Sequence, residues 1–201
     1  DFYDEPLHFS IYPSGVLKLG EKLPAAYHIS AEQNVIYRIV QLQRADTLIL
    51  DFSDCVFTYQ PLEIAVQGRF VQSISCYDTT TVQIESPITR DRLYLNFYKQ
   101  AQGSISAEID EFGLFKYEGG ALEIGGNYRV FLFHQNGTED IDARNATIKQ
   151  AQITHNGVDD IYLGTVEKIL CNINGSGNIY YSGEPEITSK INGTGALIKL
   201  E

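Results

Sequence analysis

The chain has 201 residues, of which 43 % are hydrophobic and 20 % are charged. This composition is typical of a folded globular protein, so it excludes a disordered chain, and the apolar runs are too short for a membrane-spanning helix. The formal net charge of −11 argues against nucleic acid and anionic lipid as partners, because both polyanions require clustered Lys and Arg.

The N-terminal residues 1–33 are predicted to be an extension or cap. They contain Pro6, Pro13 and Pro24, and their one helix-compatible stretch, Glu21 to Asn34, is short. The chain has no Met, so we expect a processed or truncated form from which an N-terminal export signal has been removed.

Residues 34–201 are predicted to be all-β. Short alternating runs of β-branched and aromatic residues occur at Val35 to Val40, Thr47 to Phe52 and Arg92 to Tyr98, and no stretch sustains a helical period. The cysteines Cys55, Cys76 and Cys171 are too widely spaced for a CxxC metal or redox motif, which leaves at most one disulfide and an odd thiol. Small buried apolar residues are the favoured interpretation of all three.

A repeat of about 18 residues is the most informative feature of the chain. Six glycines, at positions 103, 120, 137, 157, 175 and 193, are separated by 17, 17, 20, 18 and 18 residues, and such a period predicts a solenoid. Asparagine precedes each of the last four. Because Asn and Gly tolerate turn conformations, we predict stacked turns in which the asparagine amides form a hydrogen-bonded ladder.

An apolar residue follows each glycine by four positions and predicts an inward column: Ala107, Ile124, Ile141, Ile161, Ile179 and Leu197. The predicted fold is therefore a single-stranded β-helix, clearest over 103–201, with right-handed crossovers as the general expectation. The N-terminal cap would shield one open end, and the other end, near Leu200, would be available for self-association. An antiparallel sandwich, with the Asn-Gly pairs as hairpin turns, is the alternative.

The segment NGSGNIYYSGEP (174–185), followed by INGTG (191–195), resembles the closing motif of the putative auto-transporter adhesin family with a head GIN domain. The resemblance extends upstream to about Ala121, with a fainter echo at 103–105, although 136–138 and 156–158 lack the Gly-Ser-Gly triplet. It implies a pectin-lyase-like β-helix, secreted or lipid-anchored at the bacterial envelope, with an adhesive role towards a cell-surface glycan or protein. It brings no catalytic, cofactor-binding or metal-binding residues.

A polysaccharide-active enzyme is the alternative function. In the predicted register Asp140, Asp160 and Asn178 stack on one outer face, where oxygen ligands bind Ca²⁺ or paired carboxylates hydrolyse a glycoside. Solvated outward side chains beside an inward Ile column explain the same residues, and this interpretation is favoured. The full acidic cluster, close in sequence to Arg144, is Glu139, Asp140, Asp142, Asp159 and Asp160.

Aromatic and histidine residues give a weaker indication of a binding surface. Tyr162 and Tyr180 share one offset in the repeat and predict a two-coil aromatic strip, which either binds a ligand or only stabilises the coil. His134 and His155 occupy neighbouring offsets one coil apart, and surface or turn positions are expected for both.

Overall fold

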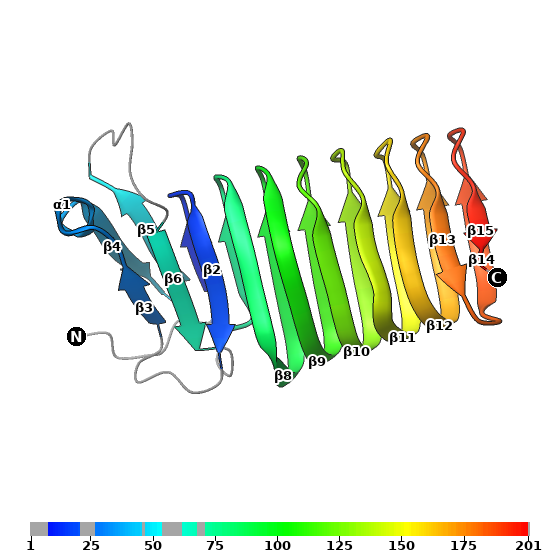
Figure 1. Ribbon diagram of the computed structural model, residues 1–201, viewed down its shortest axis with the longest axis horizontal. Coiled ribbons are helices and arrows are strands. Elements are labelled where there is room, and N and C mark those ends of the chain that lie inside the picture. Colours follow the sequence, from blue (N-terminus) through cyan, green and yellow to red (C-terminus); the bar gives the residue numbers. More distant parts are fainter. Residues whose placement is uncertain (1–7, 21–26, 46, 54–61, 68–70, 201) are drawn as a thin grey trace.

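A computed structural model describes residues 8–20, 27–45, 47–53, 62–67 and 71–200. Of these described residues, 71 % lie in strands and 2 % in helix, and the chain winds as a β-solenoid of about seven turns (Figure 1). The predicted β-helix is therefore confirmed, and the sandwich alternative is wrong.

The elements follow one another as short strands, then one helical turn, then long bent strands. The bounds are β1 (His8–Ile11), β2 (Gly15–Gly20), β3 (Tyr27–Ser30), α1 (Gln33–Ile36), β4 (Ile39–Arg44), β5 (Thr47–Phe52), β6 (Leu62–Gln67), β7 (Ser73–Cys76), β8 (Thr80–Phe97), β9 (Ala101–Lys116), β10 (Leu122–Gln135), β11 (Ile141–His155), β12 (Ile161–Ile173), β13 (Ile179–Ser182), β14 (Glu186–Ile191) and β15 (Leu197–Lys199).

Each coil from β8 to β12 is one long strand that bends between two sheet faces. Neighbouring coils pair in parallel along nearly their whole length, and their register shifts only at the bend, for example between Ala143 and Thr147 of β11. Side chains alternate between the interior and the solvent along both segments. Apolar side chains such as Phe112, Phe131 and Ile148 fill the interior and are fully buried.

One turn geometry recurs at eight positions along the edge of the solenoid. In each turn a Tyr or Asn donates its backbone N–H to a carbonyl of the neighbouring coil, at 2.8–3.0 Å. This carbonyl ends the strand in every case except that of Tyr12, whose acceptor is Leu50 within β5. The residue five positions after each turn Tyr or Asn enters the inward column, whose members pair in register. These turn residues are Tyr12, Tyr77, Tyr98, Tyr117, Asn136, Asn156, Asn174 and Asn192, and the column is Leu17, Val82, Gly103, Leu122, Ile141, Ile161, Ile179 and Leu197.

The predicted glycine alignment is correct for the last four coils and wrong before them. Gly103 pairs with Leu122, inside the strands, and the turn glycine Gly137 stacks on Glu118 rather than on Gly120. Ala107 and Ile124 are buried as expected, but they lie in other columns, opposite Gly126 and Ile105. The residue that recurs in the upstream turns is tyrosine, so alignment on glycine shifts the register.

The N-terminal segment differs from the predicted extension or cap over 1–33. Its strands β1 and β2 form a coil within the stack, because β1 pairs with both β5 and β7 and β2 pairs with both β6 and β8. The coil formed by β5 and β6 is instead flanked by antiparallel partners, β4 on β5 and β3 on β6. The run Val35 to Val40, predicted as a strand, is divided between α1 and β4. Backbone pairing to both neighbours places residues 8–20 inside the solenoid.

The cysteine prediction holds where the structure describes it. Cys76 and Cys171 are free thiols, 1 % and 4 % exposed within the core, and burial raises the pKa of the Cys76 thiol to about 12. Cys55 lies outside the described residues.

Candidate binding groove

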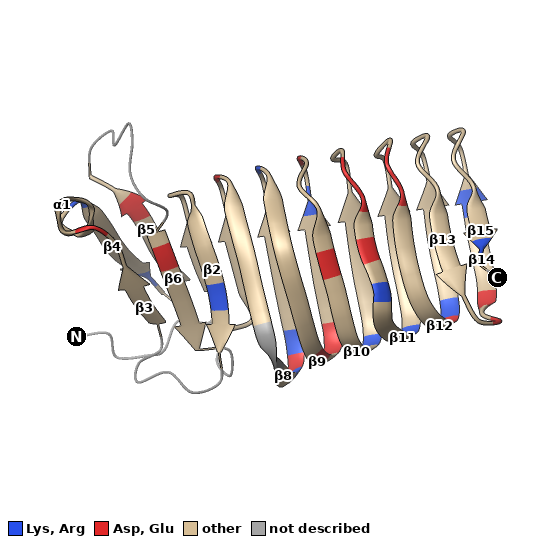
Figure 2. Cartoon of the chain, viewed as in Figure 1, with Lys and Arg blue, Asp and Glu red and all other residues tan. Residues whose placement is uncertain are grey.

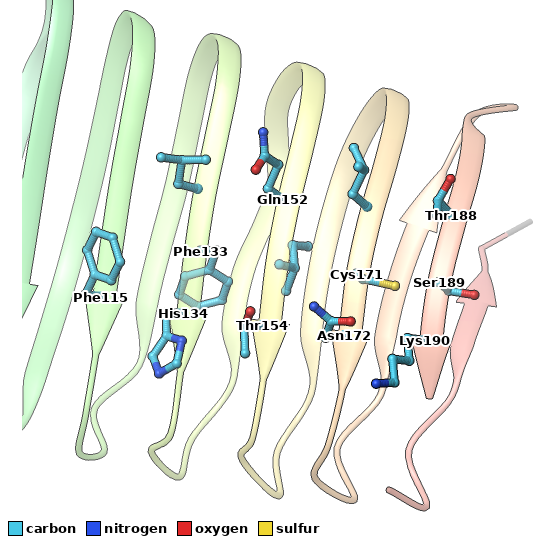
Figure 3. Close-up of a pocket in the computed structure, with 13 residues that line it drawn as sticks. Phe115, Phe133, His134, Gln152, Thr154, Cys171, Asn172, Thr188, Ser189 and Lys190 are labelled. Carbon is cyan, nitrogen blue, oxygen red and sulfur yellow. The ribbon is translucent and has the colours of Figure 1, made fainter. Parts of the chain in front are cut away.

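A shallow groove of about 530 Å³ lies on the outer face of the second strand segments of β9 to β12 and β14, and we call it the binding groove (Figure 3). Two rows of outward side chains from successive coils line it, and its volume is within the usual range for small-molecule sites. One row holds Leu132, Gln152, Leu170 and Thr188; the other holds Phe115, His134, Thr154, Asn172 and Lys190.

The polar side chains of the binding groove have no hydrogen-bond partner within the described part of the chain. Gln152, Asn172, Thr188 and Lys190 are exposed, and Thr154 is half-buried. Leu132 and Leu170 provide half-buried apolar surface between them. The groove therefore offers free amide, hydroxyl and ammonium groups beside an apolar floor.

The turn asparagines, two residues beyond the groove in each coil, are in contrast hydrogen-bonded to one another. Asn156, Asn174 and Asn192 each donate from Nδ2 to Oδ1 of the preceding asparagine, at 2.6, 2.7 and 2.7 Å. This confirms the predicted asparagine ladder. The ladder stabilises the turns, whereas the groove amides have no hydrogen-bond partner among the described residues.

An aromatic cluster adjoins the groove at Phe115 and His134. The ring of His134 lies 6.5 Å from that of Phe115 and 6.1 Å from that of Tyr117. Beyond it the tyrosines of the upstream turns stack nearly parallel, with centroids 4.5–4.9 Å apart: Tyr12, Tyr77, Tyr98 and Tyr117. The rings are stacked face to face, so the solvent meets their edges and hydroxyl groups.

Sequence reasoning missed both the binding groove and the tyrosine stack. The signal for the stack was present, because Tyr77, Tyr98 and Tyr117 precede Asn136 at intervals close to the coil period. The groove residues show no comparable signal in the sequence, because neither row repeats one residue type. One row alternates Leu with polar residues, and the other mixes aromatic, polar and basic types.

The acidic face considered for catalysis has a structural role. A carboxylate oxygen of Asp140 accepts the backbone N–H of Asp160 at 2.9 Å, and Asp160 accepts that of Asn178 at 2.8 Å. The Asp159 carboxylate accepts the backbone N–H of Glu139, whose φ is 84°. The predicted stacking is confirmed, and Figure 2 shows these acidic residues at the turns that precede β11 and β12. Among the described residues, no group of three or more His, Cys, Asp or Glu is placed to hold a metal ion.

The remaining acid, Asp142, is paired with Arg144 by a bidentate ion pair with N–O distances of 2.9 and 2.5 Å. This pair lowers the pKa of the Asp142 carboxyl. The Arg144 guanidinium also lies over the ring of Tyr162, 5.4 Å from its centroid. Tyr162 stacks on Tyr180 with centroids 4.9 Å apart, so the predicted aromatic strip exists, and its binding role stays a prediction.

A buried polar column fills the interior behind the turns. Lys116, Gln135 and His155 pair in register and are fully buried. Lys116 Nζ donates to the carbonyl of Thr138 at 3.5 Å, and burial lowers its pKa to about 8. Burial also lowers the pKa of His155. His134 faces outward, as expected, whereas the expectation of a surface or turn position is wrong for His155, which is buried at the end of β11.

Comparisons with known proteins place this geometry in a wider group. A family model described as "Putative auto-transporter adhesin, head GIN domain" matches residues 18–185. No curated protein matches the sequence. No helix in the described ranges is long and apolar enough to span a membrane.

Similar solved structures share the fold at low identity. They include a putative adhesin of Bacteroides fragilis (TM-score 0.83, 21 % identity), a putative lipid binding protein of Parabacteroides distasonis (0.68, 18 %) and a putative adhesin of Parabacteroides merdae (0.63, 15 %). In each comparison the match covers 98 % of this chain and 93 % of the other. The similarity extends over the whole solenoid.

Proposed function

Because this chain belongs to the putative auto-transporter adhesin family with a head GIN domain, we propose that it is a noncatalytic, adhesin-like module that binds a cell-surface glycan in the binding groove. The supporting observation is the contrast between the two sets of amides. The turn asparagines bond to one another, whereas Gln152 and Asn172 of the groove have no partner among the described residues.

Carbohydrates suit such a surface. Each sugar ring presents hydroxyl groups that exchange hydrogen bonds with amides and hydroxyls, and a C–H face that packs on apolar side chains. Leu132 and Leu170 lie between the polar groups of the same row. Their alternation matches a ligand that runs along the solenoid axis and meets each coil in turn.

The positions of the acidic residues support the noncatalytic assignment. The described residues that line the groove include no Asp or Glu, so paired-carboxylate hydrolysis has no acid there. Asp140 and Asp160 accept backbone hydrogen bonds instead. We further propose export to the bacterial envelope, as the family's adhesive role requires, which surface proteolysis of intact cells of the native bacterium would test.

The test is a glycan-array screen of the purified domain, with mass analysis of each bound glycan. The variant Q152A/N172A is expected to lose most of the binding, because it removes two groove amides. The matched control Q102A/N145A, which removes one exposed Gln and one exposed Asn elsewhere, is expected to retain it. Equal binding by both variants would contradict the site, cleavage of a glycan would contradict the noncatalytic role, and absence of glycan binding would point to a protein partner.

A further inference from the structure

The binding groove differs in charge from the rest of the molecule. The chain carries 26 Asp and Glu against 15 Lys and Arg, yet the described lining of the groove contains no carboxylate. It does contain Lys190, at the last position of one row, and His134 near the other end of that row (Figure 3). In so acidic a chain, this local reversal of charge calls for an explanation.

Most of the other described lysines are engaged, and the exposed Lys149, which like Lys190 lies in no ion pair among the described residues, is outside the groove. Lys99 pairs with Glu118 at 2.8 Å, and Lys168, on the same face as the groove, pairs with Glu186 at 3.2 Å. Lys18 and Lys199 likewise lie in ion pairs. Lys190 is exposed and lies in none of the ion pairs found among the described residues. Its charge is therefore available to a ligand.

We propose that the ligand of the binding groove is an oligosaccharide that carries an isolated acidic group, a carboxylate or a sulfate, held by Lys190. This inference rests on the proposed function, because it names the class of glycan for the same site. The rest of the ligand lies along the rows, with its hydroxyls on Asn172, Thr154 and Gln152. Coils are spaced by about 4.8 Å, so the four steps from Phe115 to Lys190 span roughly 19 Å.

The isolated charge reconciles this ligand with a net charge of −11. A dense polyanion needs many cations to displace its counterions, and the groove does not provide them. A single acidic group needs one cation in a region free of carboxylates. The ligand is thus a sugar chain with sparse charge rather than a nucleic acid or a uniformly sulfated polymer.

The experiment uses an array of matched oligosaccharide pairs that differ only in one acidic group, either a carboxylate or a sulfate, followed by calorimetric titration of the tightest pair. The acidic member is expected to bind more tightly than its neutral counterpart. K190Q is expected to lower that affinity about three- to tenfold, as for loss of one charged hydrogen bond, and to leave the neutral member unchanged. Carboxylate and sulfate pairs distinguish the two sources of charge.

K149Q is the matched control, because Lys149 is exposed and lies outside the groove, and its substitution removes the same charge. Equal affinity for acidic and neutral members, or an acidic preference that survives K190Q or is lost equally in K149Q, would overturn the inference while the proposed function stands. If no glycan binds at all, the proposed function fails as well.

Discussion

The asparagine ladder has a direction, and the same substitution at its two ends therefore has different consequences. Asn136 only accepts a side-chain bond, from Asn156, whereas Asn192 only donates one, to Asn174 at 2.7 Å. Aspartate retains the acceptor, so N136D is expected to change stability by less than about 0.5 kcal/mol. N192D loses the donor and sets a carboxylate against an amide oxygen, which is expected to cost about 1–2 kcal/mol.

Thermal unfolding and hydrogen exchange of the last coils measure this difference. At the size of this chain, a loss of 1 kcal/mol lowers Tm by about 2–4 °C, so N192D is expected to unfold about 2–8 °C lower. Both variants add one negative charge. Glu139 and Asp140 lie in the turn of Asn136, while the turn of Asn192 has no acid, so general charge repulsion predicts the opposite order. Equal shifts, or a larger loss in N136D, would refute the ladder as described.

Three further predictions concern the core, the turns and the tyrosine stack. Burial lowers the pKa of Lys116 from 10.5 to about 8, so the unfolded chain binds more protons than the folded chain above pH 8. The free energy of unfolding is therefore expected to rise by about 2 kcal/mol between pH 8 and 9.5. Urea unfolding of K116M should lack this rise. In G177A the new Cβ would lie 2.0 Å from the carbonyl oxygen of Asp159, which is expected to lower the free energy of unfolding by about 1–3 kcal/mol. In G125A the nearest atom to the new Cβ is the Cβ of Asn145, at 3.6 Å, so little effect is expected. Equal Tm losses in the two variants would contradict this packing. Tyr98 stacks on two rings and Tyr12 on one, so Y98A should lower Tm about twice as much as Y12A, and similar losses would show that the stack contributes no stability.

The site could be predicted from the sequence only in part. The acidic residues Asp140 and Asp160 stack as their spacing indicated, but the backbone N–H groups that they accept became visible only in the fold. A surface or turn position was expected for His155 because such polar side chains are usually solvated, and tertiary packing placed it behind the turns beside Gln135. The groove required the exact pairing of five coils, which no local pattern specifies.

The sequence by itself determined the period, the β class and the asparagine ladder, because these depend on residues that recur within one coil and on the turn preference of Asn-Gly. Only the tertiary structure decided which coils are neighbours. The coil of β1 and β2 lies between segments more than 30 residues further along the chain, since backbone pairing on both of its edges determines its place regardless of chain order. Parallel pairing then brought Tyr12 onto Tyr77 and aligned Thr154 with Asn172, so contacts between coils created both the tyrosine stack and the binding groove.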